Sequence, residues 1–175
     1  MWQPEVDSSL LVLGIDPGTA ITGYGIVCGG AKVEPVAYGV ITTPAGLALP
    51  LRLQQIYDEL TALISTHHPK TAAVEELFFA RNARTALSVG HARGVILLAL
   101  AQAGLPIYEY TPLQVKQAIT GYGLAGKEQM QQMVRLLLNL DALPQPDDAA
   151  DALAVAICHA HSLSMLSRLS LASKA

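Results

Sequence analysis

The sequence predicts a single α/β domain built on a mixed five-stranded sheet with helices on both faces. Three apolar or alternating segments with short connections open the chain, and this arrangement favours an antiparallel start to the sheet. Further along, two short strand-like segments alternate with segments of helical periodicity, which is typical of α/β folds. The 175 residues are 51% apolar and 14% charged, so the chain can bury the core of one domain.

The three opening strands are expected at 10–16, 21–30 and 32–43. The first is a continuous apolar run, which predicts a buried strand. Gly29 and Gly30 fit a hairpin turn between the second strand and the third. These strands are therefore expected to be antiparallel neighbours.

The rest of the chain is expected to alternate between helix and strand and to close with three helices. Helical spacing of apolar residues, with proline or glycine at segment ends, separates the elements. They are expected at 47–68 (helix), 71–76 (strand), 80–104 (helix), 106–110 (strand), 111–120 (helix), 127–140 (helix) and 147–166 (helix). Residues 1–9 are expected to form an N-terminal extension and 166–175 a flexible C-terminal tail, on one domain that spans 10–165.

The bulk composition argues against a secreted, membrane or disulfide-rich protein. The start of the chain holds no basic segment of a signal peptide. The longest apolar stretch falls short of the ~20 residues that span a bilayer. Two cysteines, Cys28 and Cys158, are too few for a disulfide framework or a zinc site. We therefore expect a cytoplasmic protein without a membrane partner.

The formal net charge of −3 conceals an uneven distribution. Between Phe78 and Arg135 the chain carries six lysines and arginines against two glutamates, a balance of +4. Acidic residues gather instead at 75–76 and 147–151. An acidic centre beside a basic span suits a metal-dependent enzyme that acts on a polyanion, although a randomly mixed surface would give similar counts.

Four carboxylates stand where a shared site could use them. Asp16 ends the first strand, and Glu75 ends the fourth. Asp148 and Asp151 lie three residues apart on one face of the last helix. All four converge if the first and fourth strands are neighbours and the last helix packs over them.

Each of these acids also has an ordinary structural explanation. Asp16 precedes a proline and a glycine, so taken alone it is best explained as a turn residue. Glu75 could be a solvated strand end, and Asp148 or its neighbour Asp147 could cap the helix. The hypothesis of a shared site depends on all four acids together.

Four carboxylates within a few ångströms cannot all remain ionised by themselves, because their repulsion raises their pKa values. Mg²⁺ or Mn²⁺ would supply the missing positive charge, and both prefer oxygen ligands. Two such ions about 3.5–4 Å apart can activate water and stabilise the leaving oxygen of a phosphodiester. The pattern therefore predicts a two-metal site for phosphodiester hydrolysis.

Four motifs resemble those of a known family: GIDPGTAITGYG, AVEELFFARNARTALSVGHARG, EYTPLQVKQAITGYGLAGKEQM and DDAADALAVAICH. Their order and spacing are similar to those of the RuvC family of bacterial Holliday-junction resolvases, which belongs to the RNase H-like superfamily. The resemblance extends from Leu11 to His161. It implies an RNase H-like fold and a metal-dependent crossover junction endodeoxyribonuclease that acts in DNA recombination and repair.

The resemblance also implies the roles of individual residues. It places the metal-binding catalytic carboxylates, with two Mg²⁺ or Mn²⁺ ions per site, at Asp16, Glu75, Asp148 and Asp151. Two further residues match basic residues that contact DNA and assist catalysis near the scissile phosphate: Lys116 and Lys127.

The segment that follows the fourth strand holds three candidates for further DNA contacts. Phe78 matches an aromatic residue of the family that contacts bases near the crossover. Arg81 and Arg84 could follow phosphates and make binding sensitive to salt. Asp147 is an additional acid that could cap the helix or share the ligand role, and the spacing within the motif favours Asp148.

The resemblance further implies a homodimer, a four-way DNA junction as substrate and cooperation with the RuvA–RuvB branch-migration complex. Because the junction has two-fold symmetry, two related sites are needed, and the helix at 82–103 is rich enough in apolar and small residues to form the interface. Two other hypotheses stand beside the nuclease. GIDPGT is similar to the phosphate loop of actin-like ATPases, but this chain is long enough for only one of their two domains. A junction-binding protein without activity would not need four intact acids.

Overall fold

The computed structural model describes residues 10–30, 32–76 and 83–172. Their strands and helices follow the order that the sequence predicts. The strands are β1 (Leu11–Asp16), β2 (Ile21–Cys28), β3 (Glu34–Thr42), β4 (Thr71–Glu75) and β5 (Ile107–Tyr110). The helices are α1 (Leu49–His67), α2 (Ala83–Gln102), α3 (Pro112–Thr120), α4 (Lys127–Leu137) and α5 (Asp147–Ala172). None of these helices is long and apolar enough to cross a membrane.

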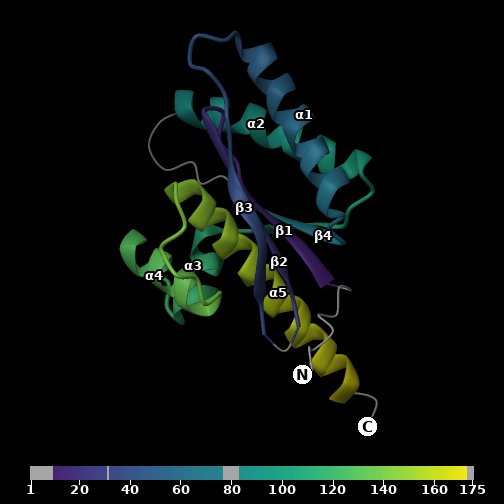
Figure 1. The fold of residues 1–175 in the computed structure, drawn as a ribbon, viewed down its shortest axis with the longest axis vertical. Helices are drawn as coiled ribbons and strands as arrows, with labels where there is room; N and C mark the ends of the chain where they lie inside the picture. The colour runs from purple at the N-terminus through teal and green to yellow at the C-terminus, as the bar shows by residue number, and fades with distance from the viewer. Residues whose placement is uncertain (1–9, 31, 77–82, 173–175) are drawn as a thin grey trace.

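The five strands form one mixed sheet in the order β3-β2-β1-β4-β5. β1, β2 and β3 are antiparallel neighbours, whereas β4 and β5 continue parallel to β1. α1 and α2 cover one face of the sheet, and α3, α4 and α5 cover the other (Figure 1). The mixed five-stranded sheet with helices on both faces is therefore confirmed.

The side chains of β1 alternate between these two faces. Leu13 and Ile15 pack in the core with α1 and α2, whereas Val12 packs in the core with α5. The same alternation places Asp16 on the side of Val12. The acid that ends β1 therefore faces α5.

Helix α5 approaches the sheet closely because glycines of β1 and β2 face it. A Cβ on Gly14 would lie 2.3 Å from the carbonyl oxygen of Ala152 and 2.5 Å from the backbone nitrogen of Ala156. A Cβ on Gly23 would lie 2.0 Å from the carbonyl oxygen of Asp148. A side chain at either glycine would therefore push α5 away from β1 and β2.

Two boundaries differ from the sequence prediction. α5 continues to Ala172, into the 166–175 segment expected as a tail, because the helix contains no glycine or proline that would end it earlier. The expected hairpin between β2 and β3 is present and Gly29 and Gly30 lie in its connection, but this connection is longer than a two-residue turn, since β2 ends at Cys28 and β3 begins only at Glu34. Val33 in this longer connection is buried in the core beside α5.

A buried histidine joins α5 to the parallel strands. His159 is fully buried; its Nδ1 lies 2.8 Å from the Tyr110 hydroxyl, and its Nε2 lies 3.0 Å from the Thr71 hydroxyl. Burial lowers the pKa of His159 to about 4, so the ring is neutral at physiological pH. Neutral hydrogen bonds thus tie the middle of α5 to β4 and β5.

Candidate active site

Asp16 and Glu75 lie side by side at the ends of two neighbouring strands. Ile15 is paired with Val74 in the parallel β1–β4 register, so the next residues of the two strands are brought together. Their carboxyl groups share a hydrogen bond. The adjacency of the first and fourth strands, on which the predicted site depends, is present.

Asp148 and Asp151 reach the same place from the first turns of α5. Gly23 pairs with Asp16 across β1 and β2, and the backbone of Asp148 lies against Gly23. The charges of Glu75, Asp151 and Asp148 all act on Asp16. The structure therefore brings together the four carboxylates that the sequence predicts.

Burial and repulsion between neighbouring carboxylates raise the pKa values of three acids in this cluster, Asp16, Glu75 and Asp151. Burial is the largest cause that raises the pKa of Asp16 to about 8, and the charges of the other three acids add to it. Burial also raises the pKa of Glu75 and the pKa of Asp151. The cluster therefore has too little positive charge around it to keep all of its carboxylates ionised.

The donor atoms of the cluster suit a hard divalent cation, because all four side chains offer carboxylate oxygens. As the described residues are placed, no three His, Cys, Asp or Glu side chains form a set of metal ligands. Asp16 and Glu75 instead hold a proton between them. The chemistry of the site fits a cation, and binding one requires this proton to leave and the carboxylates to draw together.

Lys116 of α3 and Lys127 of α4 border the cluster. Both line a hollow of about 240 Å³ together with Glu75 and Asp151. The Nζ atom of Lys127 lies 3.9 Å from a carboxylate oxygen of Asp151. The charge of Lys116 partly offsets the effect of burial on the pKa of Glu75 and on that of Asp151. Two cations thus face the acids across a space that is open to a ligand.

Asp147 faces α4 rather than the buried acids. One carboxylate oxygen lies 3.0 Å from Nζ of Lys127, and the other accepts a hydrogen bond of 2.8 Å from Nε2 of Gln131. The hydrogen bonds from Lys127 and Gln131 lower the pKa of Asp147. The additional acid of the DDAAD motif therefore holds Lys127 beside Asp151.

Comparison with known proteins identifies the family. The family model described as "Crossover junction endodeoxyribonuclease RuvC" matches residues 12–159. The chain belongs to the RuvC family. It is 60% identical over 161 residues to crossover junction endodeoxyribonuclease RuvC of Desulfitobacterium hafniense, which covers 91% of this chain and 98% of that protein. The RuvC of Chloroflexus aggregans is 60% identical over 157 residues, covering 89% of this chain and 96% of that protein.

Solved structures of RuvC proteins share the fold. Thermus thermophilus RuvC in complex with a Holliday junction substrate has a TM-score of 0.84 and 40% identity, covering 89% of this chain and 96% of that chain. The yeast mitochondrial Holliday junction resolvase Ydc2 matches with a TM-score of 0.62 at 15% identity, covering 90% of this chain and 82% of that chain, a likeness of fold alone. The resemblance read from the four motifs and the RNase H-like fold are both confirmed.

Some residues that the RuvC resemblance assigns cannot be placed. Phe78 and Arg81 lie outside the described residues, as does the side chain of Arg84, whose backbone belongs to α2. Their DNA contacts stay predictions. The four acids and the two lysines, by contrast, are brought to one place.

One charged residue beside the site is absent from the sequence prediction. Arg52 lies near the start of α1 and lines a second hollow together with Asp148. A single arginine on an amphipathic helix is ordinarily solvated, and no motif marks this one. Its position near the acids follows from the tertiary fold, which brings the start of α1 to the β1–β2 turn.

Proposed function

We propose that this RuvC-family chain resolves Holliday junctions by hydrolysing phosphodiester bonds at symmetric positions on two strands of a four-way DNA junction. The observation that carries the proposal is the buried carboxylate cluster around Asp16, with a pKa raised to about 8. A centre that lacks positive charge suits metal-assisted hydrolysis of a polyanion. Relatives described as crossover junction endodeoxyribonucleases, and a RuvC solved with a Holliday junction substrate, support this substrate class.

Two divalent cations, Mg²⁺ or Mn²⁺, would be held by Asp16, Glu75, Asp148 and Asp151. When bound, such ions supply the positive charge that activates water and stabilises the leaving oxygen. Asp16 and Glu75 extend from paired strand ends, so the sheet fixes two of the ligands. Asp148 and Asp151 come from a helix that packs directly on β1 and β2, which limits how far they can move.

Lys116 and Lys127 would stabilise the reacting phosphate. The hollow that they share with Glu75 and Asp151 gives a phosphate access to both ammonium groups. A preorganised cation is effective because it offsets charge that develops in the transition state without reorganising at that moment. The ion pair with Asp147 keeps Lys127 oriented before DNA binds.

The segment after β4 would extend the DNA surface. We assign Phe78 to stacking on a base near the crossover, an interaction worth about 1–3 kcal/mol per base. Arg81 and Arg84 would neutralise backbone phosphates. The observation behind these assignments is the match of the motif that begins at Ala73 and includes Glu75.

The active unit would be a homodimer formed through α2. Exposed residues recur along one face of this helix at Leu87, His91, Gly94, Leu98 and Ala101. Leu87 is 64% exposed and Leu98 is 52% exposed. A Cβ on Gly94 would meet nothing within 4 Å, so a partner helix can approach closely. A two-fold dimer presents two equivalent sites to a junction of the same symmetry.

In the cell, the chain would act in the cytoplasm in DNA recombination and repair. Cooperation with RuvA–RuvB is proposed because branch migration moves the crossover along the DNA and so brings it to positions where a resolvase can cut. This part of the proposal rests on family membership.

Nick mapping on a synthetic four-way junction tests the proposed function. The junction and a linear duplex of the same sequence are incubated with the protein in Mg²⁺, in Mn²⁺ and in EDTA. We expect paired symmetric nicks on the junction alone, lost in EDTA and in Asp16→Asn, which should still bind the junction. Equal cutting of the duplex, or cutting in EDTA, would contradict the proposal.

A further inference from the structure

A second hollow borders the proposed active site without including either lysine. Its volume is about 370 Å³, and it is lined by the β1–β2 turn from Gly18 to Ile21, by Arg52 of α1, by Ser88 and Val89 of α2, and by Asp148 of α5. It therefore shares one carboxylate with the cluster. Its single cationic side chain is Arg52, to which no role has been assigned above.

A chain of hydrogen bonds fixes the guanidinium of Arg52 at this hollow. Its Nε donates to Oγ1 of Thr43 at 2.8 Å, and Oγ1 of Thr43 donates to the carbonyl oxygen of Thr19 at 2.5 Å. Thr43 and Thr19 are both buried. The hydroxyl of Thr19 in turn donates to the carbonyl oxygen of Ser88 at 2.6 Å. The fold therefore orients Arg52 before any ligand arrives.

The two Nη groups of Arg52 have no acceptor among the residues that the structure describes. Its hydrogen bond there uses Nε, and the ion pairs within the described ranges involve other residues. Asp148 lines the same hollow but lies too far from Arg52 for an ion pair. An arginine fork matches the oxygens of a phosphate with two parallel N–H donors. A fork that is oriented but unpaired is suited to an anion from outside the chain.

We infer that Arg52 binds a backbone phosphate that flanks the scissile phosphate on the DNA strand in the active site. The inference rests on the proposed nuclease function, because the anion is part of the substrate. Asp148 belongs both to this hollow and to the carboxylate cluster, so a strand with one phosphate at the cluster can place a neighbouring phosphate at Arg52. The Asp148 carboxylate repels a free anion, whereas a phosphate within a bound strand is held there by neighbouring contacts.

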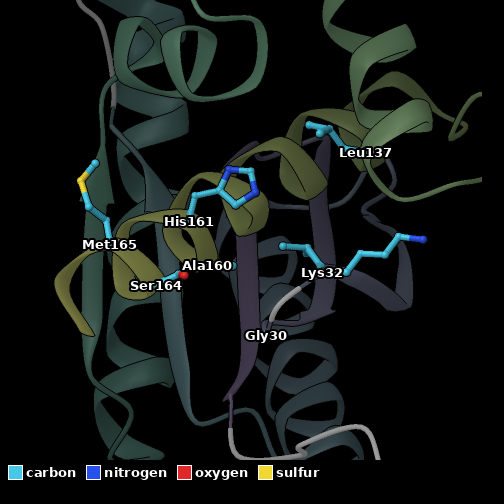
Figure 2. Close-up of a pocket in the computed structure, with 8 residues that line it drawn as sticks. Gly30, Lys32, Leu137, Ala160, His161, Ser164 and Met165 are labelled. Carbon is cyan, nitrogen blue, oxygen red and sulfur yellow. The ribbon is translucent and has the colours of Figure 1, made fainter. Parts of the chain in front are cut away.

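The test measures junction binding in EDTA, where no strand is cut, for the wild-type chain, Arg52→Gln and Lys32→Gln. Lys32 is a matched control because it carries the same charge and lines a separate hollow with His161 and Met165, which lie beyond the middle of α5 and away from Asp148 (Figure 2). We expect Arg52→Gln to bind roughly tenfold more weakly, because it removes a hydrogen bond to a charged group. The slope of log affinity against log salt should become less negative by about 0.9 for each phosphate that the variant no longer neutralises. Lys32→Gln should match the wild type in both measurements.

A second measurement locates the phosphate. Neutral methylphosphonates replace the phosphates of the cleaved strand one at a time, and each junction is titrated with the wild type and with Arg52→Gln. At one position next to the cut, the substitution should weaken binding by the wild type but not by the variant, because the variant has no guanidinium to bind that phosphate. Should Arg52→Gln unfold, Arg52→Lys replaces it: this variant keeps the charge, so its salt slope should equal that of the wild type while its methylphosphonate penalty is smaller.

The outcomes separate this inference from the proposed function. If the wild type cuts junctions and Arg52→Gln binds them equally well, or if every methylphosphonate weakens both proteins equally, the phosphate contact is overturned and the nuclease function stands. If free inorganic phosphate binds at Arg52 as tightly as the junction does, the hollow is an anion site unrelated to the strand, and the inference is again overturned. A wild type that neither binds nor cuts junctions overturns the proposed function and this inference with it.

Discussion

Gly23→Ala connects the packing of α5 to the position of Asp148, one of the four acids proposed to be catalytic. Gly23 pairs with Asp16 in the sheet, and a Cβ at this position would lie 2.0 Å from the carbonyl oxygen and 2.6 Å from the carbonyl carbon of Asp148. Ordinary contact begins at 3.4 Å, so the start of α5 must withdraw by about 1.4 Å (3.4 minus 2.0). Both contacting atoms belong to the helix backbone, so no side-chain rotation can relieve the clash.

Two effects follow from this displacement. Overpacking of this kind costs about 1–3 kcal/mol of unfolding free energy, and each kcal/mol lowers Tm by about 2–4 °C for a chain of this length. The rate should also fall, because a displacement of about 1 Å at reacting groups can reduce it roughly 100-fold, whereas a loss of about 1–3 kcal/mol leaves most of a typical domain folded. Activity should therefore fall far below the level expected from the small fraction of unfolded protein.

Thermal unfolding by circular dichroism and single-turnover cleavage of a four-way junction measure the two effects. Gly46→Ala is the matched control, since a Cβ there meets nothing within 4 Å; it should retain wild-type Tm and rate. If Gly23→Ala has the Tm and the cleavage rate of the wild type, α5 does not lie against β2 as described.

Three further predictions concern charge and assembly. Because the pKa of Asp16 is raised to about 8, the folded chain holds a proton that the unfolded chain releases above about pH 4. Without divalent cations, the unfolding free energy measured by urea titration should therefore fall by up to about 2–3 kcal/mol between pH 6 and pH 8. An equal dependence on pH in Asp16→Asn would contradict this. Asp147→Asn should lower single-turnover cleavage a few-fold with unchanged junction affinity, because Lys127 loses its partner; an unchanged rate would show that the ion pair does not position this lysine. Leu98→Arg should sediment as a monomer and lose paired nicking. The control Leu136→Arg changes a side chain on α4 that is 61% exposed, and it should remain a dimer. A dimeric Leu98→Arg would exclude this part of α2 from the interface.

The sequence predicts the acids better than their surroundings. Asp16 and Glu75 each end a strand, and Asp148 stands at the start of a strongly apolar helix, so local patterns locate them. Their convergence depends on the parallel pairing of β1 with β4, which periodicity alone does not determine. The motif resemblance supplied that adjacency.

Long-range contacts account for what the sequence did not predict. Lys127 and Asp147 are separated by a helix and a loop, so their ion pair follows only from the packing of α4 against α5. No pattern in its own helix marks Arg52. It lines the same hollow as Asp148 only because the fold brings the start of α1 to the β1–β2 turn. Gly23 in a strand did carry a signal, since glycine in a strand often marks a close backbone approach.

We propose that four carboxylates from β1, β4 and α5 act as one metal-dependent centre. Single-turnover cleavage of a four-way junction in Mg²⁺ tests it most directly, with one variant for each acid at equal junction occupancy. The variants are Asp16→Asn, Glu75→Gln, Asp148→Asn and Asp151→Asn. We expect each variant to bind the junction and to lose cleavage. Any one of the four that cleaves at the wild-type rate would contradict it.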